Sequence, residues 1–162
     1  MKTLILVRHA KSDWTQDVPD FNRPLNERGH HTAPRMARFL KEQGIAIDHF
    51  VSSPAKRALT TCRYFAETYN QSAIRKAEDL YEPHHEDFVH TLLNLSDTYQ
   101  SAALFSHNPG ISEFASSLVP ESFEFPTCAV AVFEIDCEEW SQYEGAPKKL
   151  LHFYTPKEVL DQ

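Results

Sequence analysis

An arginine and a histidine stand side by side at positions 8 and 9, directly after the apolar run TLILV. A second histidine, His107, follows the apolar run SAALFS, and Arg57 comes shortly after the segment VSSP. Guanidinium groups bind phosphate oxygens in a bidentate way and stay charged at any working pH. A neutral imidazole can attack phosphorus, and a second imidazole can donate to the phosphoryl oxygens as charge rearranges. Together these residues predict a phosphoryl-transfer site that uses neither a metal nor a cofactor.

Each of these residues also has a simpler interpretation when taken alone. An arginine in the first turn of a helix is usually solvated, and a histidine at the end of a strand is usually an ordinary polar residue with its hydrogen bonds satisfied. The functional interpretation therefore requires that the fold bring Arg8, His9, Arg57 and His107 together.

The alternation of apolar runs and helical periodicity predicts repeated strand–helix units. We expect an α/β three-layer sandwich with a mainly parallel central sheet, helices on both faces and a closing antiparallel hairpin. In such sheets ligands bind beyond the carboxyl ends of the strands, which is where Arg8, His9, Arg57 and His107 are expected. The expected strands are 3–7, 47–53, 73–77, 101–107, 129–135 and 148–154, and the expected helices include 26–44, 54–70 with Pro54 in its first turn, 86–97 and a short one after 110.

Two details of the helices are specific enough to check. Pro34 falls inside the first expected helix, where a proline kinks or restarts the coil, and Gly44 is placed to end that helix. In the third expected helix Phe88, Leu92 and Leu95 would form the apolar face.

Composition narrows the classes of function. The 162 residues predict one domain over 1–162, and the formal charge of −7 disfavours a nucleic-acid partner, which normally meets a basic face. No apolar run is long enough to span a membrane, and no secretory signal is evident, so we expect a cytoplasmic protein with no membrane partner. The three cysteines lack paired spacing, and none has an arginine six residues later, which argues against a cysteine phosphatase.

Four segments resemble the histidine phosphatase superfamily, which includes the cofactor-dependent phosphoglycerate mutases. They are LVRHAKSDWT, DFNRPLNERG, SSPAKRALTTC and FSHNPGI, and they occur in the family order from residue 3 to about 118. Small size and the segments RHAKS and HNPG look most like the SixA-type phosphohistidine phosphatases. The resemblance implies a phosphoglycerate mutase-like fold, a phosphate pocket made by Arg8, Arg57, His9 and His107, and transient phosphorylation of His9.

The sequence departs from the mutases at several positions. Ala10 replaces the family glycine, Lys11 stands where mutases usually carry an acidic residue, and no long insertion forms a lid. Thr15 stands where many members have a phosphate-contacting asparagine, and we expect it to help bind the substrate. These departures favour a phosphatase over a mutase.

Glu82 is the candidate general acid, because many members protonate the leaving oxygen with a carboxylate after the third strand; the alternative is a solvated loop residue. The segment EPHHEDFVH is the one stretch that suggests a metal, but its spacing gives no tetrahedral set of ligands. The expected function is hydrolysis of phosphohistidine on a protein. The alternatives are a small-molecule phosphomonoesterase and, less favoured, an inactive phosphoprotein-binding module.

Overall fold

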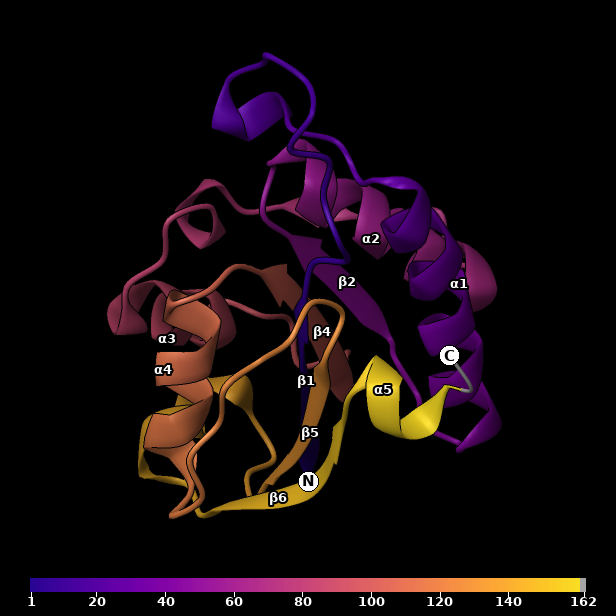
Figure 1. The fold of residues 1–162 in the computed structure, drawn as a ribbon. Helices are drawn as coiled ribbons and strands as arrows, with labels where there is room; N and C mark the ends of the chain where they lie inside the picture. Colours follow the sequence, from indigo (N-terminus) through magenta and orange to yellow (C-terminus); the bar gives the residue numbers. More distant parts are fainter. Residues whose placement is uncertain (161–162) are drawn as a thin grey trace.

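The computed structural model describes residues 1–160 and consists of one mixed six-stranded sheet between two layers of helices (Figure 1). The strand order is β3-β2-β4-β1-β5-β6. β1 to β4 run parallel, whereas β5 lies antiparallel to β1, and β6 closes the sheet as an antiparallel partner of β5. The elements are β1 Lys2–Arg8, η1 Asp20–Asn22, α1 Glu27–Glu42, β2 His49–Ser52, α2 Lys56–Thr68, β3 Arg75–Lys76, η2 Glu78–Leu80, α3 His85–Leu93, β4 Ser101–Ser106, α4 Gly110–Leu118, β5 Val130–Ile135, η3 Trp140–Gly145, β6 Lys148–Tyr154 and α5 Pro156–Val159.

The alternation of side chains along β1 divides the core into two halves. Ile5 and Val7 pack with the apolar faces of α1 and α2, whereas Leu4 and Leu6 pack with α3 and α4 on the other face of the sheet. Figure 1 shows this division, with α1 and α2 on one side of the strands and α3 and α4 on the other. A central strand covered on both faces must be apolar throughout, which explains the run TLILV.

Pro34 lies inside helix α1 without interrupting it. The helix runs without a break from Glu27 to Glu42, so the expected restart at Pro34 does not occur. A proline removes one intrahelical hydrogen bond, but the buried face of this helix packs against the sheet and α2, and that packing outweighs the local cost of about 3 kcal/mol. Gly44 ends the helix as expected, with a φ of 79° and hydrogen bonds from Gly44 and Ile45 to the last carbonyls.

Helix α3 is shorter than its apolar periodicity predicts. It ends at Leu93 and not near 97, and Leu95 joins the core from the turn that follows. Residues beyond the helix are engaged elsewhere: the carbonyl of Asp97 accepts from Lys2 Nζ at 3.1 Å, and its carboxylate accepts from the Trp140 backbone at 2.7 Å. The expected strand 73–77 is likewise reduced to Arg75–Lys76.

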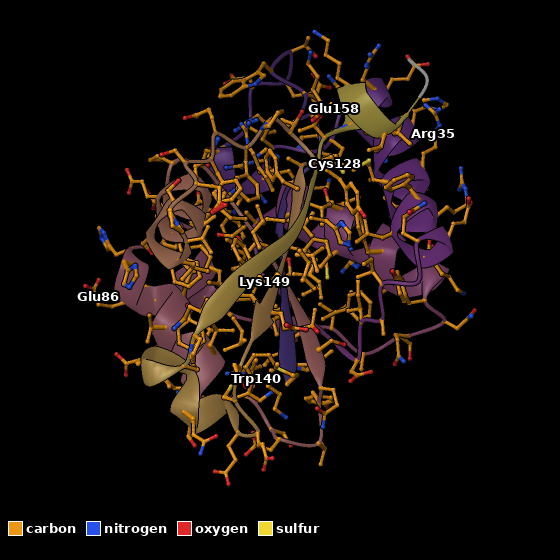
Figure 2. The ribbon with its side chains drawn as sticks, turned by 90° about the horizontal axis from the view of Figure 1, so that it is seen from below. Arg35, Glu86, Cys128, Trp140, Lys149 and Glu158 are labelled. Carbon is orange, nitrogen blue, oxygen red and sulfur yellow. The ribbon has the colours of Figure 1, made fainter. Side chains whose placement is uncertain are left out.

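The two ends of the sheet have different chemistry. Trp140 lies near the end at which β1 begins, where the buried Lys2 ammonium lies 5.5 Å from its ring centroid, while Cys128 lies at the opposite end (Figure 2).

No helix within residues 1–160 is long and apolar enough to cross a membrane.

The start of α1 packs directly on the segment that follows His9. A Cβ atom at Gly29 would overlap the carbonyl oxygen of Lys11, and the Asn26 side chain that caps the helix accepts from the Gly29 backbone at 2.8 Å. The helix and the loop after β1 therefore approach each other as closely as their backbones allow.

Gly29→Ala is expected to destabilise the protein by about 1–3 kcal/mol, because overlap with backbone outweighs the better helix propensity of alanine. Urea unfolding followed by circular dichroism measures this. Gly145→Ala is the matched control, since a Cβ there meets nothing within 4 Å, and it should change stability by less than about 0.5 kcal/mol. Equal effects of the two substitutions would contradict the packing argument.

Candidate active site

Three adjacent parallel strands deliver the candidate residues to one edge of the sheet. β4 lies between β1 and β2, and the strand register pairs Arg8 with Ser106. The first residue after β1 is His9, whose backbone donates to Ser106 at 3.2 Å, and the first after β4 is His107. The first residue after β2 is Ser53, and Arg57 follows in the first turn of α2. The structure therefore brings Arg8, His9, Arg57 and His107 to the same edge.

His9 is held by its neighbour's backbone. The ring is buried, and its Nδ1 lies 2.7 Å from the carbonyl oxygen of Ala10. A carbonyl can only accept, so Nδ1 carries the hydrogen and Nε2 keeps its lone pair. The backbone of Ala10 is fixed in turn, because its N–H donates to Thr61 Oγ1 on α2 at 3.0 Å. The fold thus selects one tautomer of His9 and fixes the ring.

His107 faces His9, with 5.2 Å between the ring centroids. Its Nε2 lies 2.7 Å from the Ser53 hydroxyl, and that hydroxyl accepts from the Ala55 N–H at 3.2 Å. The Tyr81 ring lies against the other side of His107 at 5.7 Å. Nδ1 of His107 is buried and has no hydrogen-bond partner within the described residues, so one polar position of this ring is left for a ligand.

Asp20 of η1 links the cations of the site. Its backbone carbonyl and its Oδ2 accept from Arg57 at 2.8 and 3.0 Å, and its Oδ1 accepts from Arg23 at 3.0 Å. The Tyr81 hydroxyl donates to Oδ2 at 2.7 Å. Burial alone would raise the pKa of Asp20, but the hydrogen bonds from Tyr81 and the two arginines outweigh burial and hold it well below its ordinary value.

The guanidinium groups keep open donor positions. Arg8 donates from Nη1 to the Phe125 carbonyl at 2.9 Å, and Arg23 also donates to Ser12. In the part of the chain that the structure describes, the Nε atoms of Arg8, Arg23 and Arg57 are buried without a partner. Buried donors normally find acceptors, and an oxyanion with several oxygens would satisfy donors of this kind.

Both histidines are neutral at ordinary pH. Burial, followed by the charges of Arg57, Arg8 and Arg23, lowers the pKa of His9 to about 3. Burial, followed by His9 and Arg57, lowers the pKa of His107 to about 2. For both rings, removal from water is the larger cause of the lowered pKa, and the neighbouring charges add to it.

A cavity of about 420 Å³ is lined by His107 and Arg57, whereas His9 and Arg8 are not among its lining residues. Glu82 contributes to its wall and is exposed, so the structure brings it to the same cavity as Arg57 and His107. Its role stays a prediction. The lining residues are Asp20, Arg57, Tyr81, Glu82, Pro83, His84, His107, Asn108, Pro109, Gly110 and Glu113.

Thr15 is not among the residues that line this cavity. It is exposed, and both its backbone N–H and its hydroxyl donate to Asp13 Oδ1, at 2.8 and 2.6 Å. These hydrogen bonds turn the loop after β1 back on itself. The position of Thr15 in the sequence, six residues after His9, does not reveal this turn.

The histidines of EPHHEDFVH are separated on the surface. His85 rests on Phe114, His90 lies beside Asn94, and Glu86 projects from the outer side of α3 (Figure 2). Within residues 1–160 no group of three or more potential metal-ligating side chains is gathered.

The thiols of Cys62, Cys128 and Cys137 are buried, and burial raises the pKa of Cys128 to about 12.

Sequence reasoning missed Asp20, Arg23, Ser53 and Tyr81 as parts of the site. Asp20 and Arg23 lie in the segment DFNRPLNERG, where the acid–base spacing i, i+3 was the available indication of a pair. Ser53 was noted only as the end of a strand. Tyr81 neighbours Glu82, but nothing in the local pattern distinguishes it from other loop aromatics.

Comparison with known proteins is decisive for the family. The model of the histidine phosphatase superfamily (branch 1) matches residues 4–102, which include Arg8, His9 and Arg57. The chain belongs to the histidine phosphatase superfamily. His107 lies a few residues beyond the matched range and enters this family's site through the geometry described above.

Relatives of the superfamily match the chain to different extents. An uncharacterized protein of Mycobacterium leprae is 27% identical over 165 residues, covering 93% of this chain and all of the relative. A 2,3-bisphosphoglycerate-dependent phosphoglycerate mutase of Thermoplasma acidophilum is 39% identical, but the match covers 46% of this chain and only 38% of the mutase.

The fold is that of SixA. The structure of the protein histidine phosphatase SixA complexed with tungstate superposes with a TM-score of 0.84 at 23% identity, covering 97% of this chain and 99% of SixA. The expected α/β, phosphoglycerate mutase-like architecture is therefore confirmed, including the helices on both faces and the closing hairpin.

The two neutral histidines predict how stability depends on pH. Below about pH 6.5, His9 and His107 each bind a proton in the unfolded chain. In the folded state they stay unprotonated until the pH approaches their much lower folded pKa values. Stability is therefore lost as pH falls from 7 to 5, by up to about 2 kcal/mol for each of the two.

The unmodified protein should lose more free energy of unfolding between pH 7 and pH 5 than the His107→Gln variant does, by about 2 kcal/mol. Urea unfolding of both proteins at each pH measures this difference. The exposed His152 provides the control substitution, His152→Gln. If both variants follow the pH profile of the unmodified protein, His107 is not the neutral buried group that the structure indicates.

Proposed function

We propose that this protein is a phosphatase that hydrolyses phosphohistidine on a partner protein through a phosphorylated His9. The observation that carries the proposal is the state of His9: neutral, buried and held with Nε2 unprotonated at an edge where three guanidinium groups have unpartnered N–H donors. A nucleophile with a free lone pair beside fixed cations suits attack on an anionic phosphoryl group.

In the first step, Nε2 of His9 forms a bond to phosphorus while the bond from phosphorus to the substrate's imidazole nitrogen breaks. The other ring nitrogen of the substrate's imidazole carries a proton, so the electron pair of the broken bond stays on the leaving nitrogen and the group departs as neutral imidazole. Arg8, Arg23 and Arg57 stabilise the transferring oxygens through their unpartnered Nε–H groups.

His107 contributes as a neutral donor. The proposed mechanism assigns His107 the tautomer in which Nε2 accepts from the Ser53 hydroxyl, so that Nδ1, which has no partner among the described residues, carries the hydrogen. This N–H donates to a phosphoryl oxygen as negative charge builds up. In the second step, water attacks the phosphorus on His9, the phosphorus–nitrogen bond breaks, and inorganic phosphate is released.

The protonation of nearby carboxylates favours a phosphohistidine substrate over a phosphate ester. Asp20 is close to the arginines, and its pKa lies well below the ordinary value, so it is ionised and a poor acid. Glu82 lies at the exposed rim of the cavity. A phosphohistidine imidazole that is protonated on its other ring nitrogen leaves as neutral imidazole, whereas an alcohol must leave as an alkoxide unless an enzyme acid protonates it.

A small-molecule phosphomonoesterase is the second candidate, because the cavity of about 420 Å³ carries a potential acid in Glu82 and has room for a compact phosphate ester. The two candidates differ in whether turnover needs that acid.

Phosphoryl trapping tests the proposed intermediate. A histidine-containing phosphotransfer domain phosphorylated with phosphoramidate is mixed with the protein, quenched in base within milliseconds and digested for mass spectrometry. The label should lie on Nε2 of His9 and be acid-labile. His9→Asn should give no label, and EDTA should leave the yield unchanged. Label on His107 or on a cysteine, or an EDTA loss restored by zinc or magnesium, would contradict the mechanism.

Glu82→Gln separates the two candidates. We expect phosphohistidine turnover to change by less than about twofold, because the leaving group needs no enzyme acid, while any alkyl phosphate ester should slow by about 10²-fold or more. Steady-state kcat/KM on both substrates, with the melting temperature as folding control, gives the answer. A parallel loss on both, or an ester that is the far better substrate, supports the phosphomonoesterase.

A further inference from the structure

Residues 12–23, which we call the aromatic loop, carry three of the five exposed large hydrophobic side chains of the described chain. Five large hydrophobic side chains within residues 1–160 are exposed, and three of them are Trp14 at 77%, Val18 at 39% and Phe21 at 39%. Single exposed apolar residues are common, but a group in one loop marks a contact surface. Figure 1 shows the loop projecting beyond the sheet (indigo, at the top).

The base of the aromatic loop is firmly attached. Ser12 forms a β-bridge with Leu25, and the Asp13 backbone donates to Pro24 at 2.8 Å. The buried Arg23 side chain donates to Ser12, and Thr15 and Gln16 both donate to Asp13. A loop held in this way presents its apolar side chains already ordered, so a partner meets a smaller entropy cost on binding.

The aromatic loop is also connected to the cations of the site. The Arg23 guanidinium lies 3.6 Å from the centroid of the Trp14 ring, and the Phe21 ring packs edge-on against Tyr81 with 5.2 Å between centroids. Asp20, between these residues, binds Arg57. A molecule that covers Trp14 and Phe21 therefore lies next to the phosphoryl-binding arginines.

A second border of the site is basic. Lys11 follows His9 by two residues, and together with Arg28 and Lys157 it lines a cavity of about 310 Å³. Pro126 and Thr127 form part of the same wall, directly after Phe125, whose carbonyl binds Arg8. The chain as a whole carries a formal charge of −7, so these cations are concentrated where an acidic partner would meet them.

We infer that the aromatic loop is the docking surface for the protein that presents the phosphohistidine, with apolar side chains of that partner on Trp14, Val18 and Phe21 and acidic ones toward Lys11, Arg28 and Lys157. This inference rests on the proposed function and extends it, because it makes recognition depend on the partner's surface as well as on the phosphoryl group. Small phosphoramidates would react without using the loop.

The test compares two substrates: the phosphorylated phosphotransfer domain described above, and free phosphohistidine. Val18→Asp should lower kcat/KM for the phosphoprotein by about tenfold and leave that for free phosphohistidine unchanged, since Val18 is exposed and is not among the residues that line the cavity. Trp14→Ala should lower kcat/KM for the phosphoprotein relative to kcat/KM for free phosphohistidine by a similar factor. Leu151→Asp is the matched control, because Leu151 is 37% exposed on β6 at the far edge of the sheet, and it should change neither rate.

The possible outcomes separate this inference from the proposed function. Unchanged phosphoprotein turnover in both loop variants, or equal losses on both substrates, would overturn the docking surface while the phosphatase remains. An unmodified protein that cleaves free phosphohistidine but not the phosphoprotein would also overturn it. If the unmodified protein cleaves neither substrate, the proposed function itself is wrong.

Discussion

Three guanidinium groups lie together at one end of the sheet, and the organisation of the site follows from the need to hold them there. Like charges at short range repel, and removal of each from water adds a further cost. Burial, with Arg57 and Arg23 nearby, lowers the pKa of Arg8. Asp20 is the carboxylate that binds two of these groups directly, and it is ionised because they surround it. The loop that carries Asp20 must therefore be anchored at this edge, which the contacts of Ser12 and Arg23 accomplish.

Burial, reinforced by this positive field, explains why the two rings next to the arginines stay neutral. A protonated imidazole between buried arginines would add to the repulsion, so the free energy of charging either histidine is unfavourable. The Ala10 carbonyl then decides which nitrogen of His9 is free, and the Ser53 hydroxyl fixes the ring of His107. Charge selects the protonation state, while backbone geometry selects the atom that reacts.

Much of this arrangement is predictable from the sequence because it follows from topology. Arg8, His9 and His107 lie at the ends of buried strands, and parallel strands must end at the same edge. Asp20, Tyr81 and Thr15 belong to loops, whose course depends on hydrogen bonds between side chain and backbone that no periodicity encodes. Helix α3 was overestimated for a related reason: Leu95 keeps the apolar spacing, but the chain has already left the helix to place Asp97 against Lys2 and Trp140.

Anion binding and acid catalysis impose opposite demands on a site of this kind. A carboxylate close enough to protonate the leaving group also lies close to the arginines, and their charge lowers its pKa and keeps it ionised, as Asp20 shows. Glu82 is exposed and lies in the wall of the cavity that Arg57 also lines. An imidazole protonated on its other ring nitrogen leaves as a neutral group and avoids the conflict, because it needs no acid within the cationic field. On the function proposed above, the arginine cluster therefore favours the cleavage of phosphorus–nitrogen bonds over that of phosphate esters.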